Sequence, residues 1–210
     1  TIDLDLQATA ERSLAENLSA YNKGGAAVAI DPHSGEVLAM ASYPTYSLET
    51  YVEDADARNA DNRHPELNRV TQGVYAPGST FKVLSAIAGL EEGVINAGTY
   101  ITCTGEFEYG GQKFACNNHD TPMTLDVTGA IKYSCNTFFY TVGQMLTGAK
   151  LEGWAARYGL GALTGIEIGE RSGNAAGPTY RKQMVEADPH LREWQGGDDV
   201  QAAIGQSDNG

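Results

Sequence analysis

One stretch, in which a turn is followed by an apolar helix, constrains the fold of this chain more than any other. Pro77-Gly78 indicates a turn, and Ser79 then stands where the first turn of a helix would begin. Apolar residues recur with helical spacing at Phe81, Leu84, Ile87, Ala88 and Leu90. We therefore predict a helix over residues 79–92 that ends near Gly93 and is the most buried helix of the chain.

This helix brings a hydroxyl and an amine onto one face, because positions three apart in a helix are neighbours. Ser79 is a weak nucleophile until a base takes its proton, and Lys82 can be that base if burial lowers its pKa enough to leave it neutral. Backbone N–H groups at the helix start can hold the oxyanion of a tetrahedral intermediate. The Ser-x-x-Lys pattern alone is short, however, and a capped helix with a solvated lysine explains it more simply.

A second polar motif, Ser134-Cys135-Asn136, lies further along the chain. Asp126 is predicted to start one helix and residues 136–147 to form the next, so that Ser134 lies on the short connection between them. Such a loop projects side chains into a cleft, as a proton relay and a substrate-amide ligand require. Asn136 could instead be a helix N-cap.

Weaker signals predict an amphipathic helix over residues 5–22, a hairpin of strands 25–31 and 36–42, a short helix from Trp154 to Tyr158 and a short strand over 165–169. Residues 43–75, in contrast, read as an exposed connection in which His64 and the acidic run Glu53–Asp56 are solvated. No internal repeat stands out.

Together the two polar motifs carry a resemblance, because Ser-x-x-Lys followed by Ser-x-Asn is typical of serine penicillin-binding proteins and their β-lactamase relatives. Further segments resemble the transpeptidase domain of class B, monofunctional penicillin-binding proteins: Thr1–Gln7, Gly25–Pro32, Gly35–Ser42, Tyr75–Lys82, Ser134–Tyr140, Trp154–Gly161 and Ala202–Gln206. The resemblance spans nearly the whole chain. The family's third motif, Lys-Thr-Gly, appears nowhere in it.

The resemblance implies an α+β fold of the serine β-lactamase/transpeptidase type, in which an antiparallel sheet packs against helices beside a mostly helical subdomain. We expect the terminal helix and first hairpin in residues 1–42, the helical subdomain with both motifs in about 70–160, and an irregular segment in 161–210. Because Lys-Thr-Gly is missing, we expect residues 1–210 to be a partial transpeptidase domain without its C-terminal strands, poorly active when isolated.

The resemblance also implies a reaction and a role for each motif residue. Ser79 would attack the penultimate carbonyl of a peptidoglycan stem that ends in D-Ala-D-Ala, and Lys82 would accept its proton. Ser134 would help to pass that proton to the leaving D-alanine, while Asn136 would hold the stem amide. The amine of a second stem would then form the cross-link, and β-lactams would acylate Ser79 in the same way. Neither a metal nor another cofactor is expected.

Three alternatives stay open. A β-lactamase would need a base poised over water, and Glu170-Arg171-Ser172-Gly173-Asn174 mimics the Glu-x-x-x-Asn of class A enzymes, although we interpret it as a surface turn. A β-lactam-sensing receptor domain would keep the same serine, lysine and asparagine residues. The missing Lys-Thr-Gly motif would instead suit an inactive fragment.

Charge and hydropathy limit the partners and the compartment. The formal charge of −13 argues against nucleic acid, whose phosphates need Lys and Arg. No run of about 18 apolar residues is present to span a membrane, and Thr1 is not an initiator methionine, as if the chain were excised from a longer protein. The resemblance implies a membrane-anchored parent whose extracytoplasmic domain meets peptidoglycan stem peptides, β-lactams and cell-wall synthesis proteins.

The chain has three cysteines, so at least one is unpaired within it. Cys103 and Cys116 flank a predicted hairpin over residues 106–114, and Cys135 lies inside the second polar motif. A disulfide is an open possibility, with Cys116–Cys135 slightly favoured. Together with His119 the three cysteines could also be zinc ligands, although their spacing matches no zinc-finger pattern.

Overall fold

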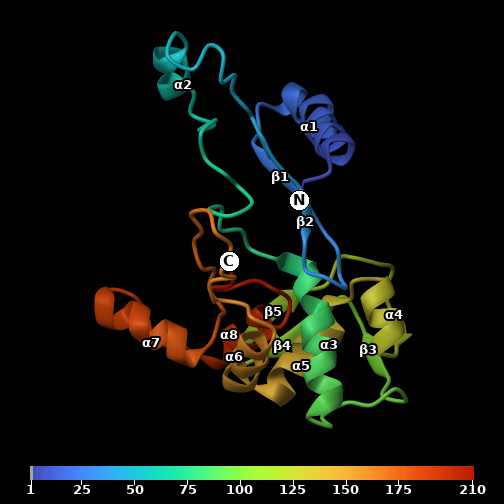
Figure 1. Cartoon of the computed structure of the whole chain (residues 1–210). Coiled ribbons are helices and arrows are strands. Elements are labelled where there is room, and N and C mark those ends of the chain that lie inside the picture. The colour runs from blue at the N-terminus through green and yellow to red at the C-terminus, as the bar shows by residue number, and fades with distance from the viewer. Residues whose placement is uncertain (1) are drawn as a thin grey trace. The chain divides into compact units, whose positions relative to one another are not determined.

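The computed structural model describes residues 2–210 and divides into two compact units. The first unit holds the residues up to Val74 together with Gly165–Arg171, and the second holds Tyr75–Thr164 and Ser172–Gly210. Each unit combines helices with short antiparallel strands (Figure 1). The predicted mixture of helix and antiparallel strand is therefore confirmed.

The first unit begins with a helix followed by a hairpin, as predicted. Helix α1 (Leu4–Leu18) starts at Asp3, whose carboxylate accepts hydrogen bonds from two backbone N–H groups, and the turn η1 (Ser19–Tyr21) extends it. Strands β1 (Gly25–Ile30) and β2 (Val37–Tyr43) pair antiparallel.

Polar and apolar contacts hold α1 against this hairpin (Figure 1). The Gln7 side chain exchanges two hydrogen bonds with the backbone of Met40, donating at 2.9 Å and accepting at 2.7 Å. Gly25 lets the strand approach the helix closely, because a Cβ there would lie 2.4 Å from Cδ1 of Leu18.

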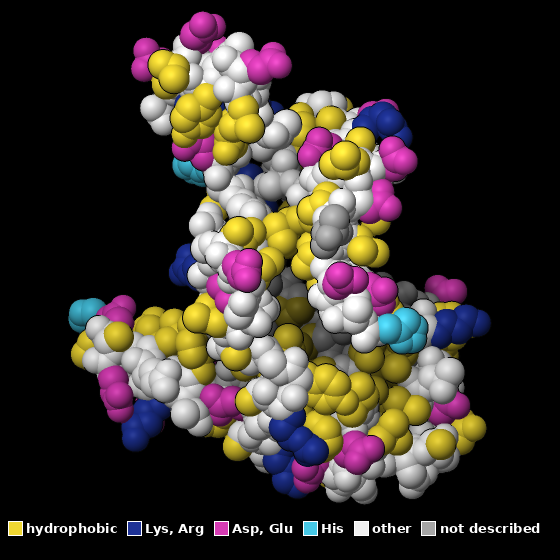
Figure 2. Space-filling model, in the orientation of Figure 1, with side chains coloured by type: hydrophobic (Ala, Val, Ile, Leu, Met, Phe, Trp, Pro, Cys, Tyr) yellow, Lys and Arg dark blue, Asp and Glu magenta, His cyan; other side chains and the backbone are white. Residues whose placement is uncertain are grey.

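The connection after β2 is largely exposed, as the sequence predicts, and contains the short helix α2 (Ala55–Ala60). The guanidinium of Arg58 lies 3.9 Å from the centre of the Tyr51 ring, which orders this segment. Hydrophobic and acidic side chains gather over it (Figure 2). His64 and the acidic run ending at Asp56 are solvated, which confirms those expectations.

Helix α5 (Asn136–Leu146) is the centre of the second unit. Its Phe138 side chain has no exposed surface. Helix α8 (Gly196–Ala202) packs against it at Gly143, where a Cβ would lie only 2.6 Å from the Cβ of Ala203. Glycine is needed at that position because the two helices approach so closely.

The helix predicted to begin at Ser79 starts as the turn η2 (Gly78–Phe81) and continues as α3 (Lys82–Glu91), which packs against α5 (Figure 1). Its position confirms the prediction. Its burial does not, because six of the ten residues of α3 are buried against seven of the eleven of α5, and four side chains of α5 have no exposed surface against two of α3. The most buried helix of the chain is therefore α5 rather than α3.

Two short antiparallel pairs lie against α5. Strands β4 (Glu106–Tyr109) and β5 (Gln112–Ala115) form the predicted hairpin around Gly110-Gly111. Strands β3 (Ile101–Cys103) and β6 (Met123–Leu125) form a second pair, which the sequence pattern did not predict.

The second unit also contains helices α4 (Val127–Lys132), α6 (Gly148–Arg157) and α7 (Pro178–Ala187). The segment 161–210, expected to be irregular, thus contains both α7 and α8. Proline at the first position starts α7, and a reciprocal cap between Gln195 and Asp198 starts α8. The short strand predicted over 165–169 is wrong, since those residues form no strand.

Candidate active site

The amine of Lys82 is buried and joins the two predicted motifs. The residue is only 2% exposed. Its Nζ donates hydrogen bonds to the Ser134 carbonyl at 2.7 Å, to the Ser134 hydroxyl at 3.0 Å and to Oδ1 of Asn136 at 2.6 Å. The fold therefore brings these three predicted site residues into contact, although 52 and 54 positions separate Lys82 from its partners.

Ser79, the fourth predicted residue, lies exposed on η2, one helical turn before Lys82. No hydrogen bond joins its hydroxyl to another residue that the structure describes. The Gly205 carbonyl accepts a hydrogen bond from the Gly78 backbone at 3.0 Å, and a Cβ on Gly205 would lie 2.1 Å from the Gly78 carbonyl oxygen. This close backbone contact fixes the turn on which Ser79 stands.

The second motif occupies a strained bend between α4 and α5. Ser134 has a φ of +52°, in the left-handed region that few residues with a Cβ adopt. Cys135 is the N-cap of α5, and its sulfur accepts a hydrogen bond from the Phe138 backbone. Asn136 is therefore the first residue of the helix, and the alternative that it is the N-cap is wrong. The bend directs the polar groups of Ser134 and Asn136 to Lys82.

Burial is the main influence on the charge of Lys82. It lowers the pKa of the amine below its usual 10.5, while the nearby thiols of Cys116 and Cys135 act in the opposite direction. The Phe139 ring, whose centre is 5.9 Å from Nζ, forms part of the apolar surroundings. A lowered pKa favours the neutral amine, which is the form that can accept a proton.

Asn118 also belongs to this group of side chains, although the sequence analysis did not identify it. Its Nδ2 donates to the Ser134 carbonyl at 2.5 Å and to Oδ1 of Asn136 at 3.1 Å. The signal available in the sequence was Cys116, two positions before Asn118, because a Cys116–Cys135 disulfide would bring this loop beside the second motif.

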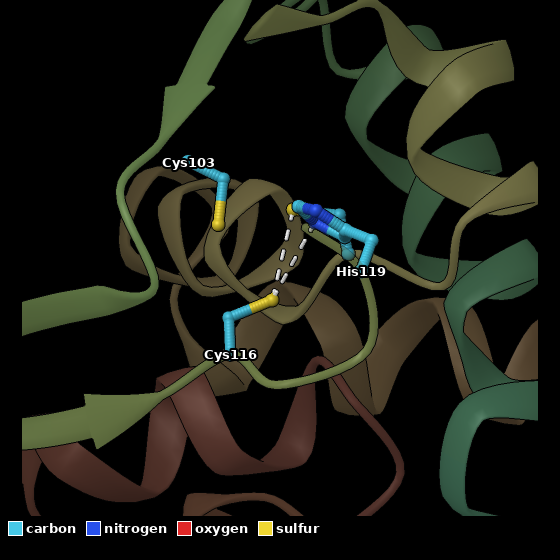
Figure 3. A group of neighbouring side chains, drawn as sticks. Cys103, Cys116 and His119 are labelled. Atoms are coloured by element: carbon cyan, nitrogen blue, oxygen red, sulfur yellow. Dashed lines mark hydrogen bonds between the residues drawn. The ribbon is translucent and has the colours of Figure 1, made fainter. Parts of the chain in front are cut away.

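Three cysteines and a histidine gather beside the N-terminus of α5. The cysteines are free thiols, so the slightly favoured Cys116–Cys135 disulfide is wrong; those two sulfur atoms lie 3.9 Å apart. The donor atoms of Cys103, Cys116, His119 and Cys135 all lie within 4.8 Å of one another. Figure 3 shows the side chains of Cys103, Cys116 and His119 turned toward a common point.

The spacing of these donor atoms fits a tetrahedral metal ion. Two thiolates bound to one zinc ion at about 2.3 Å each would lie about 3.8 Å apart. The Cys116–Cys135 sulfur distance is 3.9 Å, and the sulfur of Cys116 lies 3.8 Å from Nε2 of His119. Burial opposes ionisation of Cys116, but backbone N–H groups, including that of Asn136, lower its pKa to about 7. The four residues could therefore hold zinc.

Comparison with known proteins finds related sequences. The family described as Penicillin binding protein transpeptidase domain matches residues 25–205. The chain is 30% identical to the peptidoglycan D,D-transpeptidase MrdA of Acinetobacter baumannii and 33% identical to that of Escherichia coli K12, over 98% of the chain in each case. It spans about a third of the length of these relatives, 30% and 32% respectively.

A solved structure is similar as well. The complex between Penicillin-Binding Protein (PBP2) and MreC from Helicobacter pylori contains a chain that matches 100% of this one with a TM-score of 0.87 and 27% identity. The match covers 38% of that chain. The likeness extends over both compact units of the fold.

Proposed function

Because the chain belongs to the penicillin binding protein transpeptidase family, we propose that it carries the serine site of a peptidoglycan D,D-transpeptidase. The single observation behind the proposal is the buried amine of Lys82, which contacts Ser134 and Asn136 one helical turn after Ser79. The relatives supply the substrate class, since those of A. baumannii and E. coli are named for peptidoglycan D,D-transpeptidase activity.

The proposed reaction begins at Ser79. Its Oγ attacks the carbonyl carbon of the penultimate D-alanine, and its proton moves to the neutral amine of Lys82. Lys82 passes this proton through the Ser134 hydroxyl, 3.0 Å from Nζ, to the nitrogen of the terminal D-alanine. The carbon–nitrogen bond breaks, D-alanine leaves, and the stem remains as an ester on Ser79.

A second stem completes the reaction. Its amine attacks the ester carbonyl, loses a proton through the same two groups, and releases Ser79 with its hydroxyl restored. The backbone N–H of Ser79 donates to the oxyanion that forms in both steps, while the Asn136 amide binds the stem peptide. A β-lactam acylates Ser79 because its ring carbonyl takes the place of the scissile one.

A fluorescent penicillin tests this proposal on the whole gene product. We expect one label per protein on the peptide that contains Ser79, identified by mass spectrometry, and no label on Ser79→Ala. Thr80→Val is the matched control, because Thr80 is the adjacent exposed hydroxyl and bonds only to the Pro77 carbonyl. Labelling that survives in Ser79→Ala would overturn the proposal.

Turnover separates the transpeptidase from the β-lactamase alternative. A transpeptidase hydrolyses its β-lactam ester slowly, so a chromogenic cephalosporin should give one burst per protein and little further colour. Glu170, the base that a β-lactamase would need, accepts a hydrogen bond from the Gly165 backbone at 2.8 Å within its own loop. Rapid multiple turnover would favour hydrolysis instead.

The relatives also support a proposal for the partners and the compartment. PBP2 of H. pylori was solved in a complex with MreC, and we infer that cell-wall synthesis proteins are partners here too. The substrate lies outside the cytoplasm, so we assign this domain to the extracytoplasmic side of a membrane-anchored protein. Among residues 2–210, no helix has the length and apolar character needed to cross a membrane.

The cysteine cluster supports a second assignment, a structural zinc ion held by Cys103, Cys116, His119 and Cys135. The supporting observation is the match between their donor-atom distances and tetrahedral zinc coordination. A zinc ion would fix the second motif through Cys135, and it supplies no step of the reaction. This revises the initial expectation that the chain needs no metal.

Metal analysis tests the zinc assignment. The whole gene product should contain about one zinc per chain, and Cys116→Ser and His119→Ala should each lower that content. His190→Ala is the control, because His190 is an exposed histidine outside the cluster. Zinc content that is zero in the wild type, or equal in all variants, would contradict the assignment.

A further inference from the structure

Asn118 and Lys82 donate hydrogen bonds to the same two oxygen atoms. The Ser134 carbonyl accepts from Nδ2 of Asn118 at 2.5 Å and from Nζ of Lys82 at 2.7 Å. Oδ1 of Asn136 accepts from the same two groups at 3.1 and 2.6 Å. Each oxygen has two lone pairs, so both donors can be accommodated at once. Lys82 approaches from the buried side and Asn118 from the exposed side.

The loop that carries Asn118 is itself attached to the start of α5. It follows β5, and the sulfur of Cys116 accepts a hydrogen bond from the Asn136 backbone at 3.1 Å. This contact holds the loop against the start of α5, so the position of Asn118 does not depend on Lys82 alone.

The two donors differ in what happens to them during the proposed reaction. Lys82 must be neutral before Ser79 attacks, and a neutral amine has one N–H fewer and a lone pair that must face a hydroxyl. It therefore cannot donate to all three of its present acceptors at that stage. The carboxamide of Asn118 keeps both N–H groups throughout, because it does not titrate.

We propose that Asn118 is a positioning residue, which holds the Ser134 carbonyl and the Asn136 side chain in place while Lys82 exchanges its proton. This inference rests on the proposed function. By donating to Oδ1, Asn118 also fixes the orientation of the Asn136 amide, whose Nδ2 then donates to the Ala115 carbonyl at 3.3 Å. The left-handed bend at Ser134 thus keeps one donor that stays unchanged while Lys82 loses and regains its proton.

Stopped-flow acylation of the whole gene product by a penicillin tests the inference. It resolves the association constant K of the initial noncovalent complex from the acylation rate constant k2. Asn118→Ala should lower k2 about tenfold, the effect of losing one good hydrogen bond in the transition state, and leave K unchanged. Asn118→Asp has the same shape but replaces the donor by an oxygen, so its k2 should fall further. Asn117→Ala should behave as wild type, because Asn117 is an equally exposed neighbour with no side-chain hydrogen bond to any described residue.

The possible outcomes distinguish this inference from the proposed function. If the wild type is acylated at Ser79 but Asn118→Ala matches Asn117→Ala in k2, the inference is overturned and the proposed function stands. If K and k2 fall together with the melting temperature, Asn118 has only a structural role, and the inference is likewise overturned. If the wild type is not acylated at all, both fail.

Discussion

The Nζ atom of Lys82 lies 2.6 Å from Oδ1 of Asn136, although 54 positions separate the two residues. Lys82 begins α3 and Asn136 begins α5, and the two helices pack against each other. The contact is therefore set by helix packing rather than by local sequence. Buried Ser85 in turn ties α3 to the end of α8, because its hydroxyl donates to the Ala203 carbonyl at 2.7 Å.

Acylation should depend on pH through Lys82. Burial lowers the pKa of this amine below 10.5, and only the neutral amine can accept the Ser79 proton. The rate constant k2 should therefore rise with pH and level off above the folded-state pKa, at a midpoint below 10.5. Lys82→Arg should lose this limb and about 10²–10⁴-fold in rate, because a guanidinium stays charged. A midpoint at or above 10.5 would contradict the prediction.

Ser134→Gly and Ser134→Ala should separate the hydroxyl of Ser134 from its backbone strain. Both variants lose the hydroxyl, so both should acylate about 10²-fold more slowly. In the alanine variant the φ of +52° still strains the backbone, which costs a residue with a Cβ about 1–2 kcal/mol. Glycine removes this strain, but its unfolded chain has more conformational freedom, which offsets part of the gain in stability. Urea unfolding should show Ser134→Gly to be about 1 kcal/mol more stable than Ser134→Ala. Equal stabilities would mean that the bend is not strained.

Elements with strong local periodicity could be predicted from the sequence. Strands β1 and β2 are rich in small apolar residues on either side of a turn. The apolar run around Phe138 likewise predicted α5. The Ser-x-x-Lys and Ser-x-Asn spacings also located all four motif residues. These signals lie within short stretches of sequence, so they can be recognised without knowledge of the tertiary fold.

The features that the sequence hid depend on contacts between distant segments. Gly196 and Gly197 are typical of a turn, yet they begin α8, and Asp199 of that helix accepts hydrogen bonds from the distant Gly148 backbone at 2.6 Å and from Nε1 of Trp194 at 2.7 Å. Asn118 escaped notice because an exposed asparagine in a polar loop carries no pattern of its own. Residues 165–169 form no strand, because alternation of apolar residues alone does not make a sheet.

Asp198 should make stability fall in acid. Burial alone would raise the pKa of this carboxyl, but its hydrogen bonds with Arg192, at 2.5 and 2.6 Å, and with the Gln195 backbone hold it below its usual 3.8. A depressed folded-state pKa contributes stability that is present above pH 3.8 and lost as the pH falls through the folded value. Asp198→Asn should cost about 1–2 kcal/mol at neutral pH and less in acid, measured by urea unfolding.

The exposed pair of Lys113 and Glu106 provides the matched control for Asp198. These side chains are 65% and 51% exposed, so solvent screens the pair and Glu106→Gln should change the stability much less than Asp198→Asn at neutral pH. A loss as large as that of Asp198→Asn would show that burial does not distinguish the two pairs.

Gly205→Ala should damage the site by displacing the turn before Ser79. A Cβ on Gly205 would lie 2.1 Å from the Gly78 carbonyl oxygen, and backbone on both sides leaves no flexible side chain to move aside. Its φ of +73° adds the left-handed strain. Gly93→Ala is the matched control, because Gly93 has a φ of +69° and nothing within 4 Å of the added Cβ. We expect about 1 kcal/mol of destabilisation for Gly93→Ala, from strain alone, and at least about 3 kcal/mol for Gly205→Ala, with penicillin labelling lost only in the latter. Equal effects in the two variants would show that the contact between Gly205 and Gly78 does not hold the serine in place.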